Sequence, residues 1–407
     1  MEKLIIRGGK PLSGQILPSG SKNAALPIIF STLILRGTSV IYNVPEIGDV
    51  AVALRILEEL GASVRRIRDA VYINTDNVSP SEVRAELTSS IRASSYLLGA
   101  MLSRFGEAKI SSFGGCNFEN RPIDMHLYAA GRLGAKISPD TVFADTLTGG
   151  DILFDKPSVG ATVNSILLGV GARGKTRIYN YAREPHVISL IRFLRTAGAR
   201  IALFSDRIEI EHSPLSSGVA TIIPDVIEGA TYLSLFMATS SSASVGSLSG
   251  EELSSYLNVM TLAGAAFSAC GSAVSVTSPP TRKIEITTSP YPGFPTDLQP
   301  QTAPVMALFS GGEITELVWR SRFGYLAELE KFGLKYTTSS NKAKIYPSRL
   351  RPAEAVAIDL RAGAAILIAA LSTEGESVIH SPAVIRRGYS DLVNKLRALG
   401  ADIEEGS

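Results

Sequence analysis

A glycine-centred motif recurs six times and divides the chain into six similar segments. In each copy the glycine follows a helical stretch and precedes alternating residues that are typical of a strand. The six glycines are Gly61, Gly134, Gly198, Gly264, Gly333 and Gly400. Their spacing of 64 to 73 residues is longer than that of a solenoid repeat. Because glycine adopts the left-handed conformation at helix ends without strain, each segment is predicted to be a small α/β subdomain.

Six apolar runs lie between the glycine motifs. They cover residues 24–35, 94–102, 159–170, 232–238, 302–308 and 362–371. Runs that are apolar on nearly every side predict buried helices. Amphipathic helices such as 50–60 would cover the outside. The predicted fold class is therefore α/β, with six repeats ordered roughly strand, helix, strand, helix, strand, strand.

Composition excludes several classes of function. The 407 residues are 45% hydrophobic and carry a formal charge of only +2, so the sequence shows no footprint for nucleic acid or an anionic membrane. The longest apolar run is too short to span a bilayer. The N-terminus reads directly into a strand without a signal segment. These features predict a cytoplasmic protein without membrane insertion.

Cysteine and histidine are too sparse for a disulfide framework or a metal site. The chain has two cysteines, Cys116 and Cys270, and four histidines without ligand spacing. We therefore expect no metal.

Polar or charged groups stand near the start of each apolar helix. They are Lys22 with Asn23, Arg92, Lys156 to Ser158, Asp225 with Glu228, Asp297, and Arg361. Helix N-termini attract anions through their unpaired N–H groups and positive dipole end. For the carboxylates, simple capping is a strong alternative explanation. The cations oppose the helix dipole, which favours an anion-binding site.

The loop 113–124 contains the most distinctive local signal. Gly114 and Gly115 allow close backbone approach, and Cys116 lies a few residues before Arg121. A cysteine beside a fixed positive charge has a lowered pKa and can act as nucleophile or proton donor. A lone cysteine is more often a small buried hydrophobe, and Cys270, without charged neighbours, is expected to be one.

Several stretches together resemble the UDP-N-acetylglucosamine enolpyruvyl transferases, also called 1-carboxyvinyltransferases, of the enolpyruvyl transferase family. The matching stretches are 21–27, 114–116, 121–126, 158–162, 182–185, 290–297, 322–323, 359–364 and 387–389. The resemblance runs through the whole chain. It implies two inside-out α/β barrels, each of three βαβαββ-type repeats. The barrels would comprise residues 22–223 and residues 1–21 joined to 224–407, with the active site in the interdomain cleft.

The resemblance also implies a reaction that needs no metal or organic cofactor. The enolpyruvyl group of phosphoenolpyruvate would move to the 3-hydroxyl of UDP-N-acetylglucosamine with release of phosphate, the first committed step of peptidoglycan synthesis. Both partners would be small-molecule substrates. Cys116 would protonate the methylene carbon or form a covalent adduct, and Asp297 would position and deprotonate the hydroxyl.

The remaining site residues implied by the resemblance bind the substrates' negative charges. Lys22, Arg121 and Arg387 would hold phosphoenolpyruvate, and Lys22 and Arg387 would also belong to the catalytic group. Arg322 and Arg361 would line the same site. The residues expected to face the nucleotide sugar are Asn23, Arg92, Arg121, Pro122, Ile123, Asp124, Met125, Lys156, Pro157, Ser158, Val159, Asp297 and Val318.

Four positions depart from the family's usual pattern. They are His186, Val226, Ser321 and Arg386. These changes leave open a paralogue that acts on another uridine nucleotide in secondary metabolism. A non-catalytic scaffold of the same fold is a further alternative. Shikimate-phosphate enolpyruvyl transferases have a glycine-rich stretch that is absent around Arg92. RNA 3′-phosphate cyclases use a catalytic histidine, for which only His380 is available in the last repeat.

Overall fold

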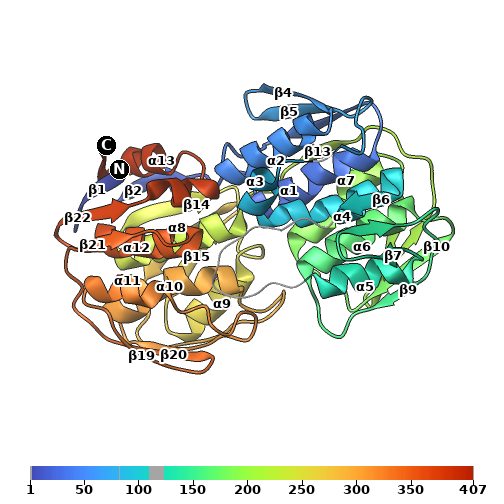
Figure 1. Ribbon diagram of the computed structural model, residues 1–407. Helices are drawn as coiled ribbons and strands as arrows, with labels where there is room; N and C mark the ends of the chain where they lie inside the picture. The colour runs from blue at the N-terminus through green and yellow to red at the C-terminus, as the bar shows by residue number, and fades with distance from the viewer. Residues whose placement is uncertain (1, 82, 110–122, 407) are drawn as a thin grey trace. The chain divides into compact units, whose positions relative to one another are not determined.

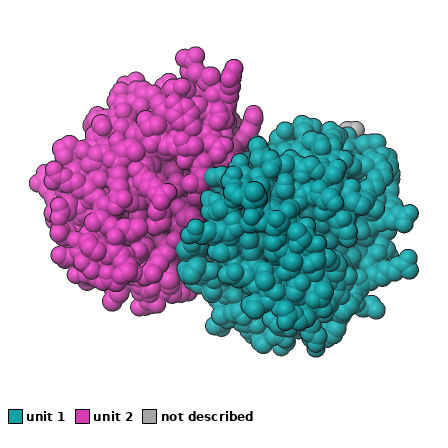
Figure 2. Space-filling model, turned by 180° about the vertical axis from the view of Figure 1, so that it is seen from behind, with its two compact units in different colours: residues 1–19, 224–407 teal, residues 20–223 magenta. Residues whose placement is uncertain are grey.

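The computed structural model describes residues 2–81, 83–109 and 123–406. Contacts within the chain divide it into two compact units, which Figure 2 shows in different colours. Unit 1 comprises Met1–Ser19 and Pro224–Ser407, and unit 2 comprises Gly20–Ile223. We propose that these units are the two predicted domains, with the first crossover two residues earlier in the chain.

Unit 2 places apolar helices inside and sheets outside (Figure 1). Its inner helices are α1 (Lys22–Ser31), α4 (Tyr96–Phe105) and α6 (Val159–Gly171), and its outer helices are α2 (Gly48–Glu59), α5 (Asp124–Arg132) and α7 (Pro185–Thr196). Shorter helical segments are η1 (Thr32–Ile34), α3 (Ala85–Ser90) and η2 (Arg92–Ser95). The sheets have the strand orders β13-β3-β5-β4, β6-β8-β7 and β11-β12-β10-β9.

The strands of unit 2 are short. They are β3 (Thr38–Tyr42), β4 (Ser63–Ile67), β5 (Ala70–Asn74), β6 (Glu107–Lys109), β7 (Lys136–Ile137), β8 (Thr141–Phe143), β9 (Asp151–Leu153), β10 (Lys175–Tyr179), β11 (Arg200–Leu203), β12 (Arg207–Glu211) and β13 (Val219–Thr221).

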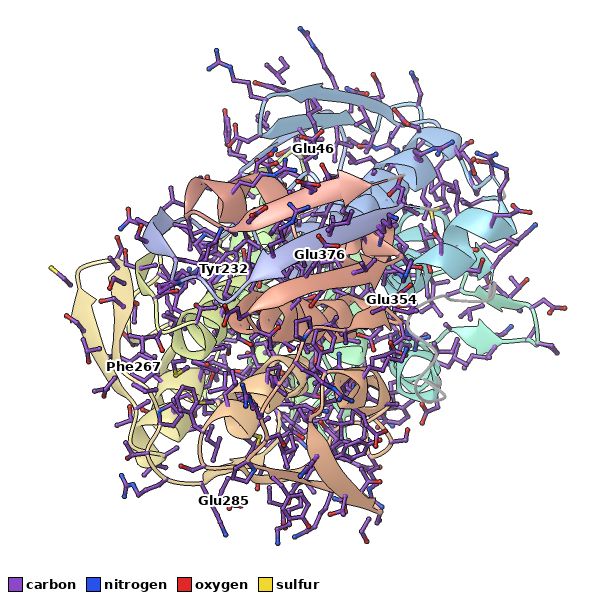
Figure 3. All side chains as sticks on the ribbon, turned by 90° about the vertical axis from the view of Figure 1, so that its left-hand side faces the viewer. Glu46, Tyr232, Phe267, Glu285, Glu354 and Glu376 are labelled. Carbon is purple, nitrogen blue, oxygen red and sulfur yellow. The ribbon has the colours of Figure 1, made fainter. Side chains whose placement is uncertain are left out.

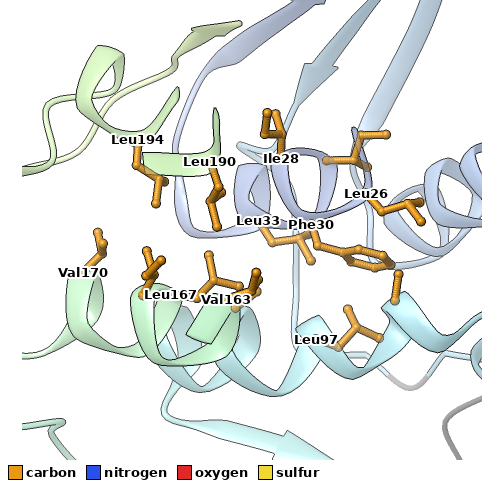
Figure 4. Packing of buried hydrophobic residues seen from close by; sticks show 14 of the residues in the cluster. Leu26, Ile28, Phe30, Leu33, Leu97, Val163, Leu167, Val170, Leu190 and Leu194 are labelled. Atoms are coloured by element: carbon orange, nitrogen blue, oxygen red, sulfur yellow. The ribbon is translucent and has the colours of Figure 1, made fainter. Parts of the chain in front are cut away.

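The inner helices of unit 2 form its hydrophobic core. Figure 4 shows Phe30 of α1 and Leu33 of η1 on the side of α1 that faces Leu97 of α4 and Val163 of α6. Phe30 meets the ring of Tyr96 in a T-shaped contact with centroids 6.2 Å apart. Because α1 buries residues on all sides, its sequence lacks a polar stripe.

Unit 1 repeats the same plan around a second core. Its inner helices are α8 (Val226–Ala238), α10 (Gln299–Leu308) and α12 (Leu360–Ser372), and its outer helices are α9 (Ser254–Leu262), α11 (Tyr325–Lys331) and α13 (Leu392–Ala398). The 3₁₀ segments are η3 (Thr296–Leu298) and η4 (Pro382–Arg387). Three four-stranded sheets have the orders β21-β22-β1-β23, β15-β16-β14-β2 and β17-β18-β20-β19.

The strands of unit 1 come from both ends of the sequence. They are β1 (Lys3–Gly8), β2 (Ser13–Ile16), β14 (Ser242–Gly246), β15 (Ala266–Cys270), β16 (Ala273–Ser278), β17 (Ile284–Thr287), β18 (Gly312–Thr315), β19 (Lys335–Ser339), β20 (Lys342–Tyr346), β21 (Glu354–Val356), β22 (Gly375–His380) and β23 (Asp402–Gly406). Strand β1 lies antiparallel between β22 and β23, where Ile6 faces Ser377 and Ile403.

Two strands pair in the sheets of one unit although the helix that follows each of them in the sequence belongs to the other unit. Strand β2 precedes α1 of unit 2 but pairs in parallel with β14 of unit 1. Strand β13 precedes α8 of unit 1 but pairs in parallel with β3 of unit 2. The first and fourth repeats thus exchange their first strands, which explains why the chain crosses twice between the units.

The six glycines have the backbone conformation that the repeated motif predicts. Their φ angles lie between 91° and 99°. At Gly61, for example, the glycine N–H donates to Glu58 O at 2.9 Å, and the next N–H, of Ala62, donates to Leu57 O at 2.9 Å. These bonds satisfy the last carbonyls of the helix. The predicted helix ends are confirmed.

Two inner helices begin three or more residues before their apolar runs. Helix α8 begins at Val226 and α10 at Gln299, whereas the runs begin at 232 and 302. The Asp225 carboxylate caps α8 by accepting from Ile227 N at 2.8 Å and Glu228 N at 3.1 Å. The polar first turn therefore belongs to the helix.

Charged side chains cover the outer faces of the sheets. Figure 3 labels Glu354 and Glu376 on the sheet that contains β1. Arg7 of β1 binds Glu376 at 3.2 Å and Glu404 at 2.7 Å. Exposed pairs of this kind contribute little stability. Within the described residues, no helix is both long and apolar enough to cross a membrane.

We predict opposite effects of alanine at two helical glycines of unit 2. A Cβ on Gly99 of α4 would lie 2.6 Å from Asn164 Oδ1 and 3.0 Å from Leu167 Cβ of α6. Gly99→Ala should therefore lower the free energy of unfolding by about 1–3 kcal/mol. Gly131 of α5 is exposed, and its nearest neighbour would be Ile137 Cδ1 at 3.8 Å. Gly131→Ala should raise stability by up to about 1 kcal/mol. Urea denaturation measures both; equal effects would contradict the close approach of α4 and α6.

Candidate active-site residues

The carboxylate of Asp297 is held by two buried arginines of unit 1. Its Oδ1 accepts from Arg322 Nη1 at 2.7 Å, and its Oδ2 accepts from Arg361 Nη2 at 3.1 Å and Nε at 3.3 Å. The arginine side chains are only 6% and 4% exposed, whereas that of Asp297 is 32% exposed. Two guanidinium groups stabilise the ionised carboxylate. The exposed part of Asp297 can still accept a hydrogen bond from a ligand hydroxyl.

A buried polar network connects Arg361 to all three inner helices of unit 1. Arg361 Nη1 of α12 donates to the Tyr389 hydroxyl at 3.1 Å. That hydroxyl lies 3.0 Å from Thr231 Oγ1 of α8, and Gln301 Nε2 of α10 lies 3.3 Å from both oxygens. Burial raises the pKa of Tyr389, so the phenol stays neutral at physiological pH. The network fixes the orientation of the guanidinium that holds Asp297.

In unit 2, Lys22 occupies the first position of α1. Its ammonium group lies 3.2 Å from Asp49 Oδ2 in the first turn of α2. Both side chains are mostly buried. Among the described residues, the side chain of Ser21, which precedes α1, makes no capping hydrogen bond, and Asn23 follows Lys22 directly. The negative charge of Asp49 therefore offsets the unfavourable interaction of the Lys22 ammonium group with the positive end of the α1 dipole.

Asn164 of α6 joins the N-terminal ends of α4 and α5. Its Oδ1 accepts from Gly99 N at 2.7 Å, which fixes the orientation of the amide. Its Nδ2 lies 3.0 Å from Ser95 O and 2.7 Å from His126 Nδ1. Because Nδ2 is a donor, His126 Nδ1 must be the acceptor, and the neutral ring carries its proton on Nε2.

The environment of this polar group shifts several pKa values. Burial lowers the pKa of His126 to about 4; the positive charge of Arg92 acts in the same direction, and Asp124 opposes it. Burial also lowers the pKa of Arg92 and raises the pKa of Tyr96 to about 12. His126 is therefore neutral at physiological pH.

The other predicted residues of unit 2 lie at helix N-termini. Ile123 precedes α5, and Asp124 and Met125 form its first turn. Lys156 is exposed and Pro157 is half-buried. Ser158 caps α6 by accepting from Ala161 N at 3.4 Å, and Val159 begins that helix. Three predicted residues, Cys116, Arg121 and Pro122, lie outside the described residues.

In unit 1, the remaining predicted residues are Val318 and Arg387. The backbone N–H of Val318 donates to Glu316 Oε1 at 2.8 Å. Arg387 is half-buried at the end of η4. Among the predicted residues, direct side-chain contacts bring together Asp297, Arg322 and Arg361.

Two carboxylates near the start of α8 have structural roles. Asp225 caps the helix. Glu228 is buried and binds Lys395 Nζ at 2.8 Å and the Tyr232 hydroxyl at 2.6 Å. The capping explanation is therefore correct for Asp225, and Glu228 anchors α13 through Lys395.

The expectation for Cys270 was wrong. This cysteine is exposed, because it ends β15 at the tight turn into β16. The run Ala269–Ser272 looked apolar in sequence, but the two-residue turn places it at the edge of the hairpin.

The four departures from the family pattern have different surroundings. Arg386 forms ion pairs with Glu2 and Glu405 on the surface of unit 1. Val226 and His186 lie in the first turns of α8 and α7, and Ser321 is exposed before Arg322. These ion pairs explain structurally why a basic residue can stand at position 386.

Sequence reasoning missed four residues that support the site. They are Asp49, Asn164, Glu316 and Tyr389. Tyr389 lay within the recognised stretch 387–389, which was a usable signal. The others depend on contacts between distant parts of the chain. Across the described parts of the chain, no three His, Cys, Asp or Glu side chains are grouped to hold a metal ion.

Each unit surrounds three buried helices with sheets, and unit 1 holds a carboxylate between two arginines. Residues 6–396 match the family described as EPSP synthase (3-phosphoshikimate 1-carboxyvinyltransferase). The chain belongs to this enolpyruvyl transferase family.

Among individual relatives, UDP-N-acetylglucosamine 1-carboxyvinyltransferase of Halothermothrix orenii is 39% identical, with 100% of each chain covered. UDP-N-acetylglucosamine 1-carboxyvinyltransferase 3 of Caldanaerobacter subterraneus is also 39% identical, with 99% of each chain covered.

Solved structures show the same fold. The enolpyruvyl transferase NikO from Streptomyces tendae has a TM-score of 0.89 at 26% identity, covering 100% of this chain and 99% of that one. An EPSP synthase from Acinetobacter baumannii has a TM-score of 0.72 at 16% identity, with both chains covered completely. The predicted fold class is confirmed.

We predict that His126 makes stability depend on pH. Its pKa is about 4 in the folded protein and ordinarily 6.5, so the unfolded chain binds more protons between these values. Stability is complete above about pH 6.5 and falls by about 3 kcal/mol as the pH falls to about 4. Denaturant unfolding should show this additional loss in the wild type relative to His126→Gln. Parallel pH dependences of the two proteins would contradict a neutral His126.

Proposed function

We propose that the chain transfers the enolpyruvyl group of phosphoenolpyruvate to the 3-hydroxyl of UDP-N-acetylglucosamine and releases phosphate. The main support is the 39% identity, over the full length of both chains, to proteins named UDP-N-acetylglucosamine 1-carboxyvinyltransferase. The partly exposed carboxylate of Asp297 adds a chemical argument, since it can accept a hydrogen bond from a substrate hydroxyl while two arginines hold it in place. Both substrates are small molecules of the cytoplasm, where we expect the protein to act.

The proposed reaction is an addition followed by an elimination. An acid, for which we propose Cys116, donates a proton to the methylene carbon of phosphoenolpyruvate. The sugar hydroxyl loses its proton to Asp297 while its oxygen bonds to the adjacent carbon. The resulting tetrahedral intermediate then returns a proton from the new methyl group to the thiolate of Cys116. The carbon–carbon double bond re-forms, and phosphate leaves with the electron pair of its bond.

The ion pairs of Asp297 with Arg322 and Arg361 limit the role that its carboxylate can have. A carboxylate bound to two arginines is a weak base, because protonation would leave both cations without their partner. Asp297 should therefore orient the hydroxyl in the bound state and take its proton only as the new bond forms.

The proposed ligand roles follow the charges of each unit. In unit 2, Lys22 and Arg121 would bind phosphoenolpyruvate, and Asn23, Arg92 and residues 121–125 and 156–159 would bind the nucleotide sugar. In unit 1, Arg387 would bind phosphoenolpyruvate, and Asp297 and Val318 would contact the sugar nucleotide. Arginine and lysine suit phosphate and carboxylate groups through charge-assisted hydrogen bonds.

A different uridine nucleotide is the second candidate acceptor. The departures from the family pattern at His186, Val226, Ser321 and Arg386 favour testing it. Phosphate release should be measured with phosphoenolpyruvate and a panel of uridine nucleotides. Release with UDP-N-acetylglucosamine supports the main proposal. Release only with another nucleotide supports this alternative, and release with none supports a scaffold.

We predict that Cys116 is required for turnover. Cys116→Ala should reduce phosphate release by about 10²-fold or more, because no acid replaces the thiol. Cys116→Asp should retain activity, because a carboxyl group can donate the proton. Nucleotide-sugar binding, measured by calorimetry, should persist in both variants.

The same thiol should be alkylated by the epoxide fosfomycin. Because Cys270 is exposed, the labelling experiment should use a Cys270→Ser background, and mass spectrometry should locate the adduct. Full activity in Cys116→Ala, or equal labelling after Cys116 is replaced, would contradict the assignment.

A further inference from the structure

The carboxylate of Glu316 is completely buried in unit 1 and has no assigned role. It follows β18 directly, and Thr288 follows the neighbouring parallel strand β17. The exposed fraction of Glu316 is 0%. Because the ends of parallel strands meet at one edge of a sheet, the topology places Thr288 and Glu316 side by side.

Four donors satisfy the two carboxylate oxygens. Oε1 accepts from Thr288 Oγ1 at 2.6 Å, Val318 N at 2.8 Å and Trp319 N at 2.9 Å. Oε2 accepts from Thr296 Oγ1 at 2.9 Å. These donors are hydroxyls and backbone N–H groups, so this carboxylate is buried among neutral hydrogen-bond partners. Burying a carboxylate is costly unless its hydrogen bonds are strong and numerous.

The carboxylate fixes the direction of the Thr296 hydroxyl. The Thr296 hydroxyl donates its proton to Glu316 Oε2. The oxygen of Thr296 is then available as an acceptor, and Arg322 Nη1 donates to it at 3.1 Å. The same Nη1 donates to Asp297 Oδ1 at 2.7 Å. A continuous chain of hydrogen bonds thus runs from Glu316 through Thr296 and Arg322 to Asp297.

Glu316 also organises the segment that leads to Arg322. Its bonds to Val318 N and Trp319 N close a turn after β18. Arg322 N in turn donates to Trp319 O at 3.0 Å. Glu316 therefore constrains Arg322 from two directions, through the Thr296 hydroxyl and through the backbone of 318–319.

We propose that Glu316 is a positioning residue for Asp297, acting through Thr296 and Arg322. The inference rests on the proposed enolpyruvyl transfer, in which Asp297 handles the acceptor hydroxyl. Misplacing a reacting group by about 1 Å can cost roughly 10²-fold in rate. Loss of Glu316 should therefore lower kcat more than it raises KM for the nucleotide sugar.

The test compares Glu316→Gln, Thr296→Val and Thr296→Ser with the matched control Thr288→Val. The control removes a hydroxyl that donates to the same carboxylate. This hydroxyl is not part of the chain of hydrogen bonds from Glu316 to Asp297. Glu316→Gln and Thr296→Val should each lower kcat at least about tenfold, and Thr296→Ser should retain it. Thr288→Val should change kcat by less than about twofold even if it lowers the unfolding midpoint. The double variant Glu316→Gln/Thr296→Val should be no slower than the slower single variant, because both break one chain.

A structural measurement separates this proposal from the proposed function. Crystal structures of Glu316→Gln and Thr296→Val should show Asp297 displaced from Arg322, with the 2.7 Å contact kept in Thr288→Val. Displacement without enolpyruvyl transfer in the wild type would support the positioning role and refute the proposed reaction. An unchanged contact with unchanged kcat in Glu316→Gln would overturn the positioning role.

Discussion

The ion pairs of Asp297 with Arg322 and Arg361 are the interaction on which the proposed chemistry of unit 1 depends. The inner helices of this unit are apolar along their length, so charges can be accommodated only near their ends. Arg361 and Arg322 are almost completely buried, and an unpaired charge there would be strongly destabilising. Asp297 compensates both cations and still exposes part of its carboxylate. A single residue thereby combines structural compensation with a ligand-accessible acceptor.

In unit 2, the polar groups buried near the ends of the inner helices are mainly neutral. The Asn164 amide satisfies backbone groups of α4 and the ring of His126 at once. Burial keeps that ring uncharged. The N-terminal ends of three helices are thus joined without an additional charge beside Arg92. This arrangement suits the binding of nucleotide phosphates that we propose for the remaining cations of unit 2.

The repeat architecture could be predicted because its signals are local. A left-handed glycine such as Gly61 or Gly400 ends a helix through bonds to residues a few positions away, so the sequence alone reveals it. Asp297 and Arg361, both singled out by recognised stretches, contact each other in the structure, and their roles in binding and catalysis stay predictions. The joining of residues 1–21 to 224–407 was implied by the resemblance. Local patterns could not predict the pairing itself, because β2 and β14 are about 230 residues apart in the sequence.

The supporting residues were missed for the same reason. Glu316 follows a strand in a sequence that resembles any polar turn, and its importance appears only when Thr296 is folded against it. Asp49 resembles an ordinary helix-start carboxylate until Lys22 lies beside it. Cys270 was misjudged because its neighbours in sequence are apolar, whereas its exposure is set by the hairpin turn. Local composition therefore predicted secondary structure better than it predicted burial.

The central claim is that enolpyruvyl transfer proceeds by addition and elimination on UDP-N-acetylglucosamine. The most direct measurement is NMR of the product formed from ¹³C-labelled phosphoenolpyruvate in deuterated water. The account predicts an enol ether on the 3-oxygen of the sugar, with deuterium on the labelled methylene carbon, because a methyl group forms and then loses a hydrogen. Label on another acceptor would contradict the proposed substrate. A 3-O-enolpyruvyl product without deuterium would contradict the addition–elimination mechanism.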